Sequence, residues 1–184
     1  VRGAVGVPLA VMVSRYYASF TNFGVAAVDA GADGLVLFNR FYQPDLDMDT
    51  LGVVATIELS SPWELRLPLR WIAILRTKLA ADSSLAATSG VHTALDVVKA
   101  LAVGADVAMM TSAVLRHGPG HINTVITDLS EWLDDHEYVS SDQIRGSMSY
   151  RTTDDPASFE RAQYYSALHS WATPTNWATP QARR

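Results

Sequence analysis

Four short apolar runs recur along the chain, at residues 9–13, 35–38, 84–87 and 107–110. None of them alternates strictly between apolar and polar positions. Short apolar runs of this kind are typical of parallel strands that are buried on both faces. The pattern therefore predicts four parallel strands.

Helical periodicity occupies the stretches that separate and follow these runs. It predicts helices over residues 18–30, 68–80 and 94–103, and a fourth that carries Ile122, Val125, Ile126, Leu129 and Leu133 on one face. Thr93 and Asp96 have the spacing of a capping box at the start of the third helix. Pro68 stands where the second helix is expected to begin, a position that suits a residue without an N–H donor.

The order of strand and helix, repeated four times, predicts an α/β fold with a parallel sheet and right-handed crossovers. A complete (β/α)8 TIM barrel takes about 250 residues. The chain has 184 residues, and we therefore expect a half-barrel of four strands. Two sheet edges and one apolar face would then need cover, which predicts a missing N-terminal half or a homo-oligomer.

A Gly-Ala-Asp motif followed by apolar residues occurs twice, in AGADGLVLFNR at residues 30–40 and in VGADVAMMTSA at residues 103–113. Gly31 and Gly104 fall where a helix is expected to end, and a residue of positive φ is common at that point. The Ala-Asp pair that follows would turn the chain into the next strand. Both copies therefore predict the same helix-to-strand connection.

The connection at residues 40–62 is long for a compact domain. Loops of such length are often functional or act as lids. Residues 56–60, with the sequence TIELS, are predicted to add a short strand within it.

The regular alternation ends after residue 138. Residues 1–138 are therefore interpreted as the half-barrel and residues 139–172 as a helical C-terminal extension. Asp155 is the expected cap of a helix in that extension, with Pro156 in its first turn. Residues 173–184 are expected to be a disordered tail.

Composition narrows the range of partners. The formal net charge is -5 and no block of lysine or arginine could neutralise a run of phosphates, which argues against nucleic acid and favours a small-molecule substrate. Cysteine is absent, which excludes disulfides and thiolate metal sites within these residues. No apolar run approaches the roughly 18 residues of a membrane span, and the start of the chain lacks a signal-peptide layout. A cytoplasmic protein with no membrane partner is expected.

Ligands of parallel strand-helix folds bind at the carboxyl ends of the strands. Two sets of small residues stand there: Thr88, Ser89, Gly90 and Val91 after the third strand, and Thr111 and Ser112 after the fourth. Backbone N–H groups in such turns, together with a helix N-terminus, can converge on an anion. The sets therefore predict a phosphate site, with simple turn and cap formation as the alternative.

Other polar residues at strand ends are Ser14, Arg15, Tyr16, Asn39 and Arg40. A metal site is not predicted. His117 and His121 are spaced like two ligands on one helix face, but the Gly-Pro-Gly sequence between them would break that helix.

Several segments together resemble a known family. They are VPLAVMVSRYYASF, GADGLVLFNRFYQPDLD, LSSPWELRLPLRWIAIL, SLAATSGVHTALDVVKALAVGADVAMMTSAVLRHGP and YVSSDQIRGSMS. They are similar to the C-terminal half of dihydroorotate dehydrogenase-like proteins, which are FMN-linked (β/α)8 barrels of the soluble kind. The resemblance implies a flavin-dependent oxidoreductase of pyrimidine biosynthesis. Such an enzyme oxidises the CH–CH bond of a dihydropyrimidine, such as dihydroorotate, with hydride transfer to FMN.

The same resemblance implies roles for particular residues. The FMN phosphate would be held by Thr88, Ser89, Gly90 and Val91 and by Thr111 and Ser112. Asn39 would hydrogen-bond the substrate near the flavin. Met12 would lie against the flavin ring, where the family has a lysine. The family's general base, a serine or cysteine, lies on a loop after the fourth barrel strand and outside this chain, so no catalytic residue is assigned.

Two other functions stay open at this point. Met12 and the missing base favour a non-catalytic half-barrel remnant or interaction module. The two phosphate-like loops also fit a barrel enzyme that binds a phosphorylated substrate without flavin.

Overall fold

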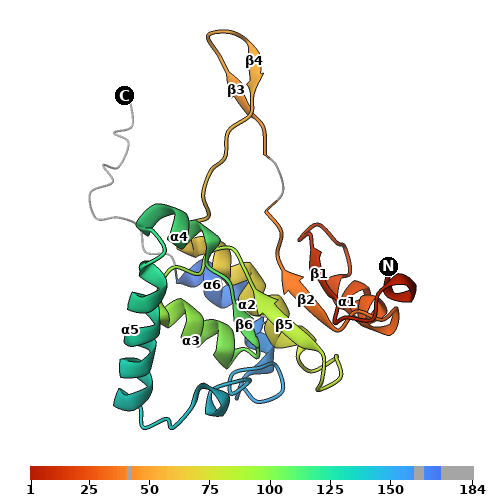
Figure 1. The fold of residues 1–184 in the computed structure, drawn as a ribbon, viewed down its shortest axis with the longest axis vertical. Helices are drawn as coiled ribbons and strands as arrows, with labels where there is room; N and C mark the ends of the chain where they lie inside the picture. Colours follow the sequence, from red (N-terminus) through yellow and green to blue (C-terminus); the bar gives the residue numbers. More distant parts are fainter. Residues whose placement is uncertain (41–42, 160–163, 171–184) are drawn as a thin grey trace, which may run out of the picture.

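A four-stranded parallel sheet forms the centre of the molecule (Figure 1). The computed structural model describes residues 1–40, 43–159 and 164–170. The strands lie in the order β1 (Ala10–Val13), β2 (Gly34–Leu37), β5 (Ser84–Ala87) and β6 (Val107–Ala108), and every neighbouring pair is parallel. All four fall within the apolar runs or one residue outside them, so the predicted half-barrel is confirmed.

The helices α1 (Phe20–Asp29), α2 (Arg66–Leu75) and α3 (Ala94–Ala102) alternate with these strands and pack on one face of the sheet. They are followed by α4 (Thr111–His117) and α5 (His121–Asp135), and α5 packs against α3. Leu37 and Leu85 point from the sheet into this layer, where they share a buried core with Ile72 of α2. Because side chains alternate along a strand, the residues next to Leu37 in β2 and next to Leu85 in β5 face the other side of the sheet.

Two predicted boundaries move in the structure. The second helix begins at Arg66 rather than at Pro68, because a 3-10 turn, η2 (Pro62–Leu65), leads directly into it. Pro68 therefore lies in the first turn of α2, where proline is still tolerated since those N–H groups have no helical acceptor. The fourth strand is also shorter than predicted, since Met110 is already the N-cap of α4.

The long connection contains a hairpin of β3 (Asp45–Asp47) and β4 (Gly52–Val54), which projects from the body of the molecule (Figure 1). The predicted strand at residues 56–60 is wrong, because the chain pairs earlier. Asp47 closes the turn by accepting the N–H groups of Asp49 and Thr50 at 2.9 and 3.2 Å. The Thr50 side chain, followed by these N–H groups, lowers the pKa of Asp47 below its ordinary 3.8.

Residues 146–148, in the region after residue 138, lie beside the end of α3 at the amino-terminal side of the sheet. The described part of the region after residue 138 contains the short helices η3 (Ser141–Gln143), η4 (Pro156–Phe159) and α6 (Tyr164–His169). The N–H groups of Gly146 and Met148 donate to the last carbonyls of α3, at 2.9 and 2.8 Å. Pro156 begins a 3-10 turn rather than the predicted α-helix. The expected tail at residues 173–184 lies outside the described residues.

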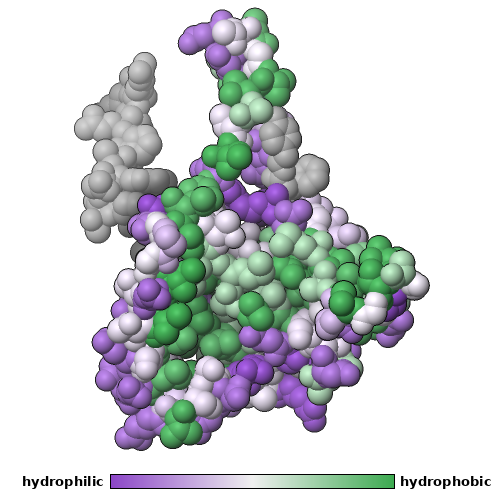
Figure 2. Space-filling model, in the orientation of Figure 1, coloured by the Kyte–Doolittle hydropathy of each residue, from purple (hydrophilic) through white to green (hydrophobic). Residues whose placement is uncertain are grey.

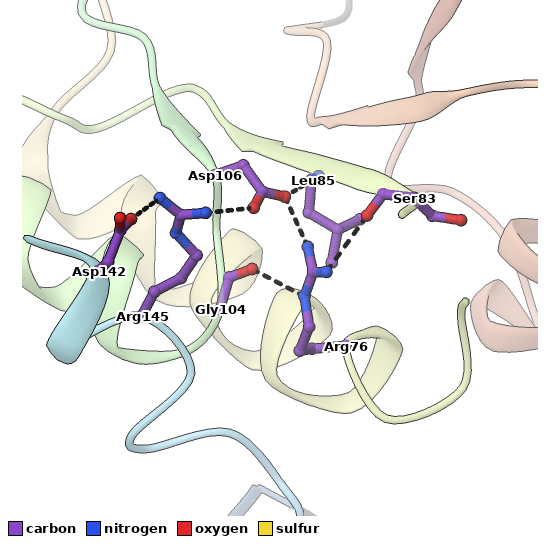
Figure 3. Close-up of polar contacts among 7 residues, drawn as sticks. All are labelled: Arg76, Ser83, Leu85, Gly104, Asp106, Asp142 and Arg145. Carbon is purple, nitrogen blue, oxygen red and sulfur yellow. Dashed lines mark hydrogen bonds and ion pairs between the residues drawn. The ribbon is translucent and has the colours of Figure 1, made fainter. Parts of the chain in front are cut away.

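The repeated Gly-Ala-Asp phrase builds the same hydrogen-bonded arrangement twice, which we call an arginine clamp. Gly31 and Gly104 have φ values of +100° and +107°, as predicted. In the second clamp, Arg76 at the end of α2 donates through Nε to Gly104 O at 3.0 Å and through Nη2 to Asp106 Oδ2 at 2.6 Å (Figure 3). Arg76 Nη1 reaches Ser83 O at 3.2 Å. Asp106 also accepts the N–H of Leu85, at 2.8 Å.

The first clamp repeats each of these bonds with other residues. Arg2, in the short η1 helix (Arg2–Ala4), donates through Nε to Gly31 O at 2.7 Å and through Nη1 to Val7 O at 3.0 Å. Its Nη2 binds Asp33, which also accepts the N–H of Leu9 at 2.6 Å. Each clamp thus fastens the start of one strand to the start of the next.

Candidate functional site

A cleft of about 310 Å³ opens at the carboxyl ends of the four strands. The residues that the sequence singled out for the site all line it: Met12, Asn39, Thr88, Ser89, Gly90, Val91, Thr111 and Ser112. Its volume lies at the lower end of the range for ligand pockets, which is about 300 to 1,000 Å³. The structure therefore brings together residues from the ends of all four strands.

Three of the other polar candidates at strand ends, Ser14, Arg15 and Tyr16, do not line this cleft. Arg15 instead donates to the hydroxyl of Tyr16 at 3.3 Å. This hydrogen bond lowers the pKa of Tyr16 below its ordinary 10.0. The pair forms an exposed contact at the end of β1.

The turn of residues 88–91 is held in an unusual backbone conformation. Ser89 and Gly90 have φ values of +69° and +91°. Ser89 Oγ donates to Phe38 O at 3.1 Å, which ties the turn to the end of β2. A Cβ on Gly90 would lie 2.4 Å from the backbone N of Leu65, so only glycine fits there.

The capping box predicted for α3 is confirmed, and it limits what the helix end can offer a ligand. Asp96 is buried, and its Oδ2 accepts the N–H groups of His92 and Thr93, each at 3.1 Å. These two donors are therefore occupied by the helix's own carboxylate. Within the described part of the chain, the backbone N–H groups of Ser89 and Val91 have no acceptor.

Thr111 and Ser112 form the first turn of α4 rather than a loop before a helix. The first N–H groups of a helix have no acceptor within it, so this turn presents backbone donors beside two hydroxyl groups. Met110, the N-cap residue, has no side-chain oxygen that could satisfy them. Thr111 is exposed at this turn.

Ser60 connects the two predicted phosphate-binding segments and was missed in the sequence. It is 2% exposed. Its Oγ accepts the N–H of Gly90 at 3.2 Å, and its own N–H donates to Ser112 Oγ at 3.0 Å. The only sequence signal was its place in the long connection, which gives no hint of these two partners.

Arg40 and Glu64 form an ion pair at the edge of the cleft. Arg40 Nε lies 3.1 Å from Glu64 Oε1, and Glu64 Oε2 accepts the N–H of Ser61 at 2.8 Å. The Ser61 contact belongs to the capping box of η2, so the turn before α2 fixes the carboxylate that in turn orients Arg40. This places a positioned guanidinium in the cleft that Asn39 also lines.

Met12 occupies the β1 side of the cleft and is 48% exposed. A thioether can pack against a flat ligand but cannot supply a positive charge. On the opposite side, the cleft is lined by Met109, Met110 and Leu115. These two sides of the cleft are therefore apolar, and the polar side chains of the cleft belong to the segments between them.

The predicted helix break between His117 and His121 does not separate their side chains. The Gly-Pro-Gly sequence does end α4 and α5 begins after it, yet the two imidazole rings lie 4.8 Å apart. His121 Nε2 hydrogen-bonds His92 O at 2.8 Å. Among the residues that the structure describes, no three side chains form a group that could hold a metal ion.

Comparison with known proteins finds a dihydropyrimidine dehydrogenase and a dihydroorotate dehydrogenase to be similar to this chain. No family model matches the chain. The chain is 22% identical over 160 residues to the chloroplastic dihydropyrimidine dehydrogenase (NADP(+)) of Arabidopsis thaliana, a match that covers 80% of this chain and 38% of the relative. The resemblance inferred from the sequence is therefore confirmed.

The fold matches that of a solved dihydroorotate dehydrogenase. The ligand-free enzyme from Eimeria tenella superposes with a TM-score of 0.60 and 18% identity, over 75% of this chain and 39% of that one. The chain thus spans well under half the length of the proteins it matches. No helix in the described part of the chain is both long and apolar enough to cross a membrane.

Proposed function

We propose that this chain is the FMN-binding part of an oxidoreductase of the dihydroorotate dehydrogenase type. The observation that supports this most is the convergence of all the expected site residues on one cleft at the strand ends. The similarity to dihydropyrimidine dehydrogenase and the dihydroorotate dehydrogenase fold support the same reading. The proposed substrate is a dihydropyrimidine that is oxidised at its CH–CH bond, as in cytoplasmic pyrimidine biosynthesis.

The donors in the cleft fit a phosphate group. In the part of the chain that the structure describes, the N–H groups of Ser89 and Val91 have no acceptor, and the first turn of α4 adds further N–H groups and the hydroxyl of Thr111. A phosphate at this point would replace the acceptors that the backbone lacks. The α3 end contributes less, because Asp96 already holds the donors of His92 and Thr93.

The remaining residues would orient the other groups. Met12 would pack against the flavin ring, and Asn39 would hydrogen-bond the substrate beside it. The flavin, when bound, supplies the hydride acceptor, while the protein contributes position and electrostatics. Arg40, held by Glu64, adds a positive charge to the cleft that Asn39 also lines.

Flavin titrations of the purified 184-residue chain test the cofactor assignment. The fluorescence of FMN should be quenched on binding. Riboflavin, which lacks the phosphate, should bind more weakly by roughly tenfold or more. A yellow protein on purification would also separate this function from a non-catalytic module and from a barrel that binds another phosphorylated compound. A folded chain that binds neither flavin, or binds both equally, would contradict the proposal.

A matched pair of variants locates the phosphate. Thr111 and Thr124 are both exposed threonines on helices. Thr111→Glu places a carboxylate in the first turn of α4, where it suits the helix dipole but repels a phosphate. It should therefore abolish the preference for FMN over riboflavin without loss of stability, whereas Thr124→Glu should leave that preference unchanged.

A further inference from the structure

The segment that returns from the hairpin to the body of the molecule lies against both predicted phosphate-binding segments. It comprises residues 55–61, after β4 and before η2 (Figure 1). Figure 2 shows a band of hydrophilic surface between the projecting hairpin and the apolar face of the sheet. Leu59, Ser60 and Ser61 lie close to the turn of residues 88–91 or to α4. The returning segment therefore touches both sides of the proposed phosphate site.

Ser60 bonds the two sides directly. It is 2% exposed, its Oγ accepts the N–H of Gly90 at 3.2 Å, and its backbone N–H donates to Ser112 Oγ at 3.0 Å. Gly90 stands between Ser89 and Val91, so Ser60 takes the middle N–H of the turn and leaves the two outer ones available to an anion. One buried residue thus joins the turn after β5 to the first turn of α4.

The turn of residues 88–91 also packs tightly against the returning segment. A Cβ on Gly90 would lie 2.4 Å from the backbone N of Leu65 and 2.9 Å from Ser61 O. This close approach leaves the turn no room to move toward these two residues, and the hydrogen bond to Ser60 opposes movement away from them. The position of the turn is therefore set from two directions.

Helix α4 is bound to the returning segment at two points. Besides Ser112, Arg116 one turn later donates through Nη2 to Leu59 O at 3.2 Å. β6, which leads into α4, pairs with β5 over only two residues, and a methionine, Met110, stands at the N-cap of the helix. The contacts with Leu59 and Ser60 thus hold the start of α4 where strand pairing and capping hold it weakly.

We propose that Ser60 is the positioning residue of the phosphate site, because it sets the spacing between the donors of residues 89–91 and those of the first turn of α4. This inference rests on the proposed function, since it takes phosphate to be the bound group. Donors on two segments bind one small anion together only when their separation is held to within about 0.5 Å. Ser60 holds that separation through its bonds to Gly90 and Ser112.

Flavin titrations of Ser60→Ala in the 184-residue chain test this role. The substitution removes the acceptor of the Gly90 N–H but keeps the backbone N–H that binds Ser112. FMN should bind roughly tenfold more weakly than to wild type, while the affinity for riboflavin, which lacks the phosphate, should stay unchanged. Ser112→Ala removes the other bond at a partly buried position and should reduce the FMN preference in the same way, so it provides the test should Ser60→Ala not fold.

Ser149→Ala is the matched control. Ser149 is also buried, at 4% exposed, its Oγ shares a hydrogen bond with Thr152 Oγ1 at 2.9 Å, and it does not line the cleft. This variant loses a buried serine hydroxyl as Ser60→Ala does, but away from the phosphate site. It should leave the affinities for FMN and riboflavin as in wild type.

Hydrogen exchange without flavin tests the link between the two segments independently of the ligand. Ser60→Ala should accelerate exchange at Gly90 and also within α4, although the bond to Ser112 is kept, because the turn and the helix are then no longer tied to each other. The amides of β2 and β5 should stay as protected as in wild type.

Three results would each overturn the positioning role. They are an unchanged preference for FMN over riboflavin in Ser60→Ala, an equal loss of that preference in Ser149→Ala, and exchange within α4 that Ser60→Ala leaves unchanged. A wild-type chain that itself does not prefer FMN would contradict the proposed function. The exchange measurement then decides alone, since accelerated exchange in α4 supports the link through Ser60 and unchanged exchange overturns it.

Discussion

The first and second arginine clamps make equivalent bonds in unequal surroundings. The side chains of Arg76 and Asp106 are 18% and 22% exposed, whereas those of Arg2 and Asp33 are 34% and 52% exposed. Asp106 also lies 3.4 Å from a second guanidinium, that of Arg145 (Figure 3). The repeated Gly-Ala-Asp sequence therefore supplies the same acceptors in both clamps, and burial determines how much each set of bonds contributes to stability.

Removal of Arg76 should have the largest effect. Arg76→Ala leaves Asp106 partly buried without its main cation and frees two carbonyl oxygens, so the free energy of unfolding should fall by about 2 kcal/mol. Urea denaturation measures this loss. Arg2→Ala is the matched control in the more exposed clamp and should cost clearly less. An equal loss in both variants would show that burial does not distinguish the clamps.

Substitution of the clamp glycines should give the next largest effect. A Cβ on Gly104 would lie 2.8 Å from Cγ of Arg76, and one on Gly31 would lie 2.9 Å from Cγ of Arg2. Gly104→Ala and Gly31→Ala should each destabilise by about 1 kcal/mol or more through the positive φ. The second clamp should lose more, because Arg76 is less free to move aside.

A double-mutant cycle separates the contact from the backbone strain. Gly104→Ala combined with Arg76→Ala should cost less than the sum of the single variants, because the clash needs both residues. Strict additivity would mean that the backbone conformation alone is responsible.

Acid should weaken the first clamp through Asp33. The N–H of Leu9 and then the Arg2 side chain lower the pKa of Asp33 below its ordinary 3.8. A lowered folded-state pKa gives a stability contribution that is complete above the unfolded value and is lost as the pH falls through the folded value. The stability difference between wild type and Asp33→Asn should therefore be constant above about pH 5 and shrink toward pH 2. A difference that grows on acidification would reverse this assignment.

Removal of Arg145 should have the smallest effect. Arg145 is 40% exposed, pairs with the exposed Asp142 and supplements Asp106, a carboxylate that Arg76 already binds. Arg145→Ala should cost about 0.5 kcal/mol, and the loss should fall further in high salt. A loss as large as that of Arg76→Ala would mean that Asp106 depends equally on both cations.

The strands and the capping box of α3 could be predicted because their signals are local. Buried parallel strands leave continuous apolar runs, and the Thr93 and Asp96 pair is read within one turn. The positive φ of Gly31 and Gly104 could be predicted equally well, since a residue of positive φ is common where a helix ends. The positions of the strand ends then followed from the parallel topology, which is why the candidate site residues converge.

The features that escaped prediction depend on partners far away in the sequence. The carboxylates of Asp33 and Asp106 looked like turn residues, because their arginines lie 31 and 30 positions away. Ser60 lies 30 positions from Gly90 and 52 from Ser112. The strand predicted at residues 56–60 does not form. The turn closed by Asp47 instead pairs residues 45–47 with residues 52–54, which precede that segment.

The clamps also couple units that are not adjacent in the chain. Arg76 ends α2, yet its acceptors Gly104 and Asp106 lie beyond the whole β5–α3 unit, and Asp106 holds the first residues of β5 as well. Detachment of β5 and α3 alone would break bonds on both sides of that unit. The half-barrel should therefore lose its structure in blocks of at least two strand-helix units, with β5 and α3 among the last to open.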